Sequence, residues 1–154
     1  EPFDVAIRIG ESENSRLIAR KLASLTPYLY ASPDYLERSG EPIEPADLGR
    51  HECLSIPKAG SWTLQNDKRT VKALVSGRFM LNSVGMMRRL ATLDMGLILM
   101  PEEIVADELV SGKLRRIMPH WHGVPMPVYA VTETRLLPAR TQRFIEFLRE
   151  RLER

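Results

Sequence analysis

The sequence predicts an α/β fold, and three observations lead to this prediction. Short apolar runs of strand length alternate along the chain with segments that carry helix signals. The composition, with 44% hydrophobic and 27% charged residues, is that of a folded globular protein and excludes a collagen-like or disordered chain. The length of 154 residues lies at the upper side of the usual single-domain range.

The first elements are short and strand-like. Residues 3–9 alternate apolar and polar side chains for part of their length and end at Gly10, which predicts a strand and a turn. Residues 11–16 are polar and loop-like, and residues 17–23 fit a helix or a strand equally well. Residues 28–31 predict another strand.

The next helix has clear signals at both ends. Ser32 is expected to cap its N-terminus, with Pro33 in the first helical position, where its missing N–H costs nothing. Gly40 is expected to end the helix. Residues 42–48 predict a loop with a short helical turn. Strands are then expected at 53–56, 62–65, 70–76 and 79–81.

A second helix is predicted after Ser83, which is again a favourable N-cap residue. Its apolar residues recur at three- and four-residue spacing, and Gly96 is expected to close it. These apolar residues are Met86, Met87, Leu90 and Leu93. The continuous apolar run 97–100 is typical of a buried strand.

The last third of the chain repeats this alternation. Pro101 is expected to start a helix whose first turn is acidic, which complements the helix dipole. A turn at 111–113 leads into a strand at 114–117, and 128–131 predicts a further strand. The final helix is expected to start near Pro138. Its predicted buried stripe consists of Phe144, Ile145, Phe147, Leu148 and Leu152.

Several short segments occur together in an order that closely resembles the effector-binding domain of LysR-type transcriptional regulators. Each segment is weak evidence alone, but together they extend from residue 3 to residue 148. The segments are 3–10 (FDVAIRIG), 17–22 (LIARKL), 31–36 (ASPDYL), 45–48 (PADL), 51–54 (HECL), Trp62, 81–83 (LNS), 96–97 (GL), 100–101 (MP), 112–114 (GKL), 137–140 (LPAR) and 144–148 (FIEFL).

The resemblance implies a two-lobed fold like that of the type 2 periplasmic binding proteins, with a ligand cleft between the lobes. Residues 31–130 are expected to form a complete second lobe. Residues 1–30 would be a partial first lobe, and 131–154 its return strand and C-terminal helix. The resemblance further implies that the chain is an N-terminally truncated fragment. The winged helix-turn-helix DNA-binding domain and the start of the first lobe would lie outside it.

The same resemblance places the effector site on three segments. Its expected residues are Arg8, Ile9, Gly10, Asn82, Ser83, Val84, Met100 and Pro101. Independently of the family, a helix N-terminus offers unsatisfied N–H groups to a carboxylate, and an arginine binds anions in a bidentate manner. Three alternatives stay open: Ser83 as a helix cap only, Arg8 as part of an ion pair, and 100–101 as a plain strand-to-helix turn.

The sequence gives little support to other chemistries. His51 and Cys53, or His120 and His122, supply only two metal ligands each, whereas zinc sites need three or four, so no metal site is expected. Cys53 leads an apolar segment and is expected to be a buried thiol. The chain contains no Gly-x-Ser-x-Gly motif, Gly-x-Gly-x-x-Gly motif or phosphate-binding loop.

These observations predict a sensory module that is not an enzyme and needs no cofactor. A small carboxylate or aromatic metabolite is its expected effector. The expected partners are other copies of the chain, in a dimer or tetramer, and DNA only through the missing domain. The net charge of +2 argues against direct binding to nucleic acid. The single cysteine suits a reducing, cytoplasmic location, and no apolar run is long enough to span a membrane. An enzyme or a free-standing solute-binding protein on the same architecture is the alternative.

Overall fold

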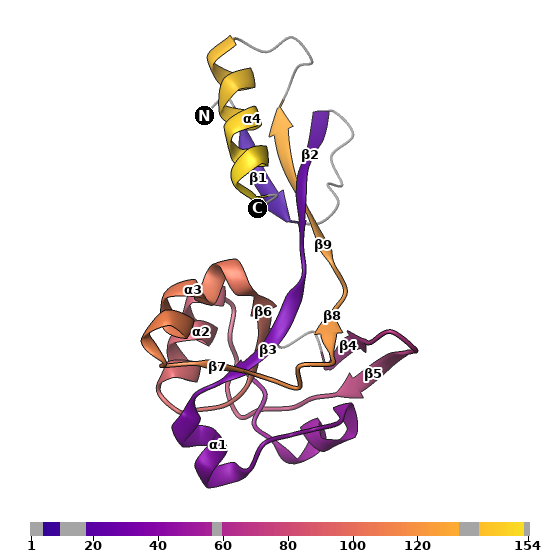
Figure 1. Ribbon diagram of the computed structural model, residues 1–154, viewed down its shortest axis with the longest axis vertical. Helices are drawn as coiled ribbons and strands as arrows, with labels where there is room; N and C mark the ends of the chain where they lie inside the picture. The colour runs from indigo at the N-terminus through magenta and orange to yellow at the C-terminus, as the bar shows by residue number, and fades with distance from the viewer. Residues whose placement is uncertain (1–4, 10–17, 57–59, 133–138, 153–154) are drawn as a thin grey trace. The chain divides into compact units, whose positions relative to one another are not determined.

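Contacts within the chain divide it into two compact units. Unit 1 consists of Glu1–Leu25 and Pro125–Arg154, and unit 2 consists of Thr26–Val124. The computed structural model describes residues 5–9, 18–56, 60–132 and 139–152 (Figure 1). The predicted second lobe, residues 31–130, begins and ends slightly further along the chain than unit 2. The assignment of the units to a first and a second lobe stays a prediction.

Unit 1 contains a three-stranded antiparallel sheet with the strand order β1-β9-β2. These strands are β1 (Ala6–Ile9), β2 (Ile18–Leu25) and β9 (Met126–Thr132). The ambiguous segment 17–23 is therefore a strand over its described residues, because β2 pairs along its length with β9. Helix α4 (Ala139–Leu152) lies beside the sheet, and Ile145 packs with Leu22 and Val128 in its core (Figure 1).

The stripe predicted for α4 is only partly correct. Ile145 is 2% exposed, and Leu148 and Leu152 are partly buried, as expected. Phe144 and Phe147 are instead 45% and 50% exposed. These two positions are three residues apart and form a second face of the helix, which the narrow sheet of unit 1 does not reach.

A second three-stranded antiparallel sheet, in the order β6-β3-β7, runs through unit 2. Its strands are β3 (Pro27–Ala31), β6 (Ile98–Pro101) and β7 (Arg115–Ile117). Successive side chains of β3 enter different cores, because Leu29 packs with Trp62 and Leu64 whereas Tyr30 packs with residues of the helices. The strands predicted at 28–31, 97–100 and 114–117 are thus confirmed with small shifts in their limits.

The helices of unit 2 confirm the caps predicted at Ser32, Gly40 and Ser83. They are α1 (Pro33–Ser39), the 3₁₀ helix η1 (Pro45–Arg50), α2 (Val84–Thr92) and α3 (Glu102–Ser111). The Ser32 hydroxyl oxygen accepts a hydrogen bond from the Tyr35 backbone N–H at 3.1 Å. Gly40 ends α1 with φ of 83°, and Gly112 ends α3 in the left-handed region. Within the described ranges, no helix is long and apolar enough to cross a membrane.

A third sheet, in the order β5-β4-β8, completes unit 2. Its strands are β4 (Ser61–Gln65), β5 (Thr70–Leu74) and β8 (His122–Gly123). The strands predicted at 53–56 and 79–81 are wrong. The Cys53 N–H donates to the Ser76 carbonyl and the next N–H, of Leu54, donates to the Leu97 carbonyl. Because the segment changes partner after one residue, no ladder develops beyond an isolated bridge.

Gly96 has another role than the one predicted. Helix α2 ends at Thr92 with Leu93 as its C-cap, so Gly96 does not close the helix. It adopts φ of +156°, and a Cβ atom there would lie 2.6 Å from the Glu52 carbonyl oxygen. A glycine is therefore needed because two backbone segments approach closely.

Candidate functional site

The N-terminus of α2 is the best-defined part of the predicted site. Ser83 is its N-cap, and the Ser83 hydroxyl oxygen accepts a hydrogen bond from the Met86 backbone N–H at 3.0 Å. The predicted capping role is confirmed. Asn82, Ser83 and Val84 are all exposed. Since Oγ of Ser83 acts as an acceptor toward the helix, its O–H remains able to donate to a ligand.

This turn presents several hydrogen-bond donors and no negative charge. The first backbone N–H groups of α2, including those of Val84 and Gly85, have no acceptor within the helix. No acidic residue occurs in the first helical turn. Among the described residues, the Asn82 side chain has no hydrogen-bond partner. The arrangement suits the carboxylate of a small molecule, because partial positive charge and N–H donors converge at a helix N-terminus.

The second predicted segment, at the end of β6, contributes mainly to the core. Met100 is 3% exposed and packs with Met87 and Leu81, which directly precedes the Asn82–Ser83 turn. Pro101 is the N-cap of α3 and still pairs with Pro27, so the expectation that it is the first helical residue is wrong. The fold thus brings both segments to one apolar cluster, and the Met100 side chain itself is buried in that cluster.

Tyr30 belongs to the same cluster and was not predicted as a site residue. Its side chain is fully buried, and within the described part of the chain its hydroxyl has no hydrogen-bond partner. Burial raises the pKa of the phenol, and the Glu102 carboxylate raises it further. An unpaired buried hydroxyl costs about 1–3 kcal/mol. No sequence signal distinguishes this tyrosine from an ordinary core residue of a strand.

The third predicted segment belongs to unit 1. Arg8 and Ile9 are exposed residues of β1, in register with Tyr129 and Val128 of β9. Gly10 lies outside the described residues.

A family model for the LysR substrate binding domain matches residues 1–153. The chain belongs to this family. Its fold class is the one predicted, since the solved LysR regulatory domains that it resembles have the periplasmic-binding-protein-like fold.

Three similar proteins illustrate the match. HTH-type transcriptional regulator PtxR of Pseudomonas aeruginosa is 33% identical over 99% of this chain and 50% of its own length. The full-length virulence activator AphB of Vibrio cholerae has a TM-score of 0.81 and 28% identity, covering 97% of this chain and 52% of that one. The regulatory domain of CrgA from Neisseria meningitidis has a TM-score of 0.81 and 27% identity, and the match covers 97% of this chain and 75% of that one. The LysR domain described here spans about half the length of the curated relatives it matches.

His51 and Cys53 of this LysR domain have structural partners. The His51 Nδ1 atom lies 2.9 Å from the Tyr35 hydroxyl, and the Cys53 thiol lies 3.7 Å from the Leu48 carbonyl oxygen. Burial raises the pKa of the Cys53 thiol to about 12. Among the described residues, no group of three His, Cys, Asp or Glu side chains could hold a metal ion.

Proposed function

We propose that this LysR domain senses a small metabolite that carries a carboxylate, with or without an aromatic ring, and thereby controls DNA binding by a full-length regulator. The observation that carries the proposal is the exposed N-terminus of α2. There Ser83 and Asn82 offer side-chain donors beside the free backbone N–H groups.

The proposed effector contacts are those of the family resemblance. Besides Asn82, Ser83 and Val84, they include the backbone of 100–101 and the unit 1 segment 8–10. Arg8 is an exposed strand residue whose guanidinium suits a second contact to an anion. A ligand changes the balance between two states only by its difference in affinity for them, so binding has to favour one state.

A thermal-shift screen of carboxylates against matched amides tests this function. A carboxylate that binds the native chain raises its Tm with concentration, and the amide of the same compound is expected to do so far less. Replacement of Asn82 by Ala should reduce the shift in Tm at least fivefold, whereas replacement of Thr63, an exposed residue of β4, by Ala should not. No carboxylate-dependent shift, or equal losses in both variants, would contradict the proposed site.

We further infer that the protein works without catalysis, in the cytoplasm and as a homo-oligomer of two or four copies, and that it contacts DNA only through a separate domain. The exposed Phe144 and Phe147 of α4 support self-association, because paired apolar side chains on one helix face favour burial. Light scattering of the wild-type chain and a Phe144→Glu/Phe147→Glu variant checks the assembly.

An enzyme would instead convert the bound metabolite, which NMR of the ligand would detect as a new product.

A further inference from the structure

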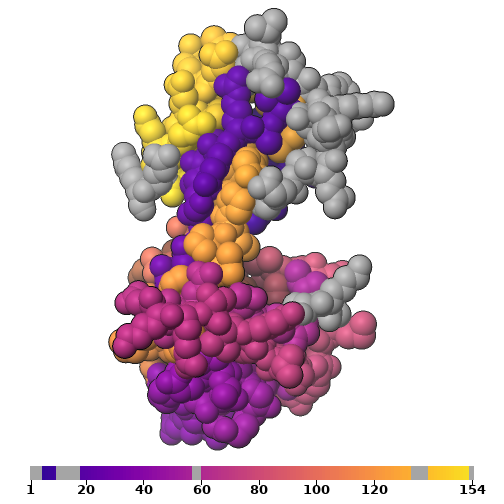
Figure 2. All heavy atoms as spheres, turned by 90° about the vertical axis from the view of Figure 1, so that its right-hand side faces the viewer, coloured from indigo at the N-terminus to yellow at the C-terminus, as the bar shows by residue number. Residues whose placement is uncertain are grey.

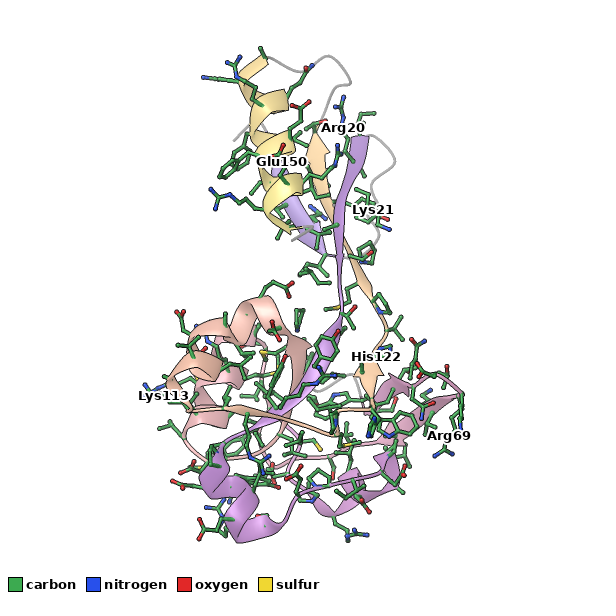
Figure 3. All side chains as sticks on the ribbon, viewed as in Figure 1. Arg20, Lys21, Arg69, Lys113, His122 and Glu150 are labelled. Atoms are coloured by element: carbon green, nitrogen blue, oxygen red, sulfur yellow. The ribbon has the colours of Figure 1, made fainter. Side chains whose placement is uncertain are left out.

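Unit 2 contains a cleft that is separate from the α2 turn. Its volume is about 580 Å³, and it lies between the segment before η1, the turn that joins β4 to β5, and the loop before β8. None of its lining residues belongs to α2 or β6. The volume falls within the ~300–1,000 Å³ that is usual for small-ligand sites. Arg69 and His122, which both line it, are labelled in Figure 3. Strands β4 and β5 lie on the right in Figure 1, and Figure 2 shows that side of the molecule facing the viewer.

One end of the cleft is apolar. A smaller pocket of about 230 Å³ adjoins it and shares three apolar residues, Ile43, Pro119 and Trp121, and the polar His120 with it. Ile43 is 65% exposed, so its side chain is available for contact, whereas Trp121 is 4% exposed and forms part of the floor. This end offers apolar surface to a hydrocarbon or aromatic group, which would leave water on binding.

The other end carries one charge of each sign without an ion-pair partner among the described residues, at the β4–β5 turn, beside Arg69, which pairs with Glu44. Asp67 and Lys68 are exposed, and within the described ranges neither side chain has an ion-pair or hydrogen-bond partner. The Asn66 side-chain oxygen accepts from the backbone N–H groups of Lys68 and Arg69, each at 2.9 Å. These bonds hold the turn in one conformation, which lowers the entropy lost when a ligand binds.

Three further polar residues of the cleft, Glu44, Arg69 and His122, already have partners, whereas His120, which also lines it, is exposed. The Arg69 guanidinium lies 5.3 Å from the centre of the Trp121 ring and 3.6 Å from the Glu44 carboxylate. Arg69 therefore connects the turn to both other walls and is neutralised by Glu44. His122 Nδ1 lies 2.8 Å from the Gly123 carbonyl oxygen, which can only accept, so Nδ1 carries the proton. Nε2 of the neutral ring is then an acceptor.

We propose that this cleft is a second ligand site, which binds a small zwitterion with an apolar side chain, the chemistry of a free apolar α-amino acid. Lys68 binds the carboxylate, and Asp67, with the acceptor nitrogen of His122, binds the ammonium group. The apolar side chain lies against Ile43 and Pro119. A ligand with a single charge meets an unmatched like charge at the turn, and this disfavours both simple anions and simple amines.

The test is an NMR titration of the full ¹⁵N-labelled chain with L-phenylalanine, 3-phenylpropionate and phenethylamine. The last two compounds keep the apolar group but carry one charge each. Saturable shifts are expected for the backbone amides of 66–69 and for the indole N–H of Trp121, which lines the cleft, but not for that of Trp62, which does not. L-Phenylalanine should bind at least tenfold more tightly than either analogue. Non-saturable shifts, or an analogue that binds equally well, would overturn the proposal.

Two double variants complete the test, both with unchanged net charge. Asp67→Asn/Lys68→Gln should weaken L-phenylalanine binding at least tenfold. Asp107→Asn/Lys113→Gln removes exposed charges elsewhere in unit 2, with Lys113 on the opposite side from Arg69 (Figure 3), and should leave binding unchanged. Equal losses in both variants would overturn the proposal. A Ser83→Ala variant should bind L-phenylalanine like the wild type, which separates this site from the proposed effector site.

Discussion

Substitutions of Ser83 separate the two roles that this residue has at the start of α2. Its side-chain oxygen caps the helix by accepting from the Met86 N–H at 3.0 Å, and its exposed O–H is the proposed donor to a carboxylate effector. Ser83→Ala removes both functions. Ser83→Asp keeps an acceptor at the N-cap, where Asp and Ser stabilise helices equally well, but places a negative charge at the effector site.

The expected magnitudes differ for stability and for binding. Loss of the cap in Ser83→Ala should lower the free energy of unfolding by about 1 kcal/mol, and Ser83→Asp should change it little. For binding, loss of one hydrogen bond to a charged group costs about 1.5–3 kcal/mol, which weakens affinity by about tenfold or more. The carboxylate of Ser83→Asp would repel an effector carboxylate at ~4 Å by about 1–4 kcal/mol, depending on solvent screening.

Calorimetric titration measures the effects on affinity, with a carboxylate that raises the Tm in the screen as the ligand. Chemical denaturation measures the effects on the free energy of unfolding. Ser32→Ala is the matched control, because Ser32 caps α1 through a bond of nearly the same length, 3.1 Å, but is not a proposed effector residue. It should lose stability and retain affinity. The reasoning would be refuted if Ser83→Asp bound the carboxylate like the wild type, or if Ser32→Ala lost as much affinity as Ser83→Ala.

Three further predictions concern stability and reactivity. Gly96→Ala should lower the free energy of unfolding by about 2 kcal/mol in denaturant titrations, because of the positive φ and the close carbonyl, whereas Gly49→Ala, with open space around it, should not. The Cys53 thiol, with its pKa raised to about 12 by burial, should react with 5,5′-dithiobis(2-nitrobenzoate) at pH 8 only after unfolding in guanidinium. Backbone N–H groups of Glu44 and Ile43 hold the pKa of Asp47 at about 2 instead of 3.8. Ionised Asp47 therefore stabilises the folded chain above pH ~4, and the Tm difference from Asp47→Asn should shrink as the pH falls below 4 and vanish below about 2.

Local signals predicted the helices of unit 2 well. Both serine caps could be predicted because the side chain and the N–H that it accepts from are three residues apart. The segment 17–23 could not be assigned in the same way, since its strand conformation depends on pairing with β9, more than one hundred residues away. The false strand at 53–56 has the same cause, because its backbone partners are the distant Ser76 and Leu97.

The proposed effector site was predicted in part. The cap and exposure of Ser83 follow from its position before a helix, whereas the burial of Met100 depends on how α2 packs against β6. Tyr30 could not be found at all, because only the packed cluster shows that its hydroxyl lacks a partner.

The sequence by itself determined the family, the order of most elements and the starts of the two serine-capped helices, since these depend on neighbouring residues and on ordered motifs. The tertiary structure decided which apolar side chains are buried, so that Ile145 lies in a core and Phe147 does not. It also formed the cleft of unit 2, whose walls come from residues near 43, 67 and 121. Such a cleft depends on contacts between distant segments, and no pattern within a short stretch of sequence encodes them.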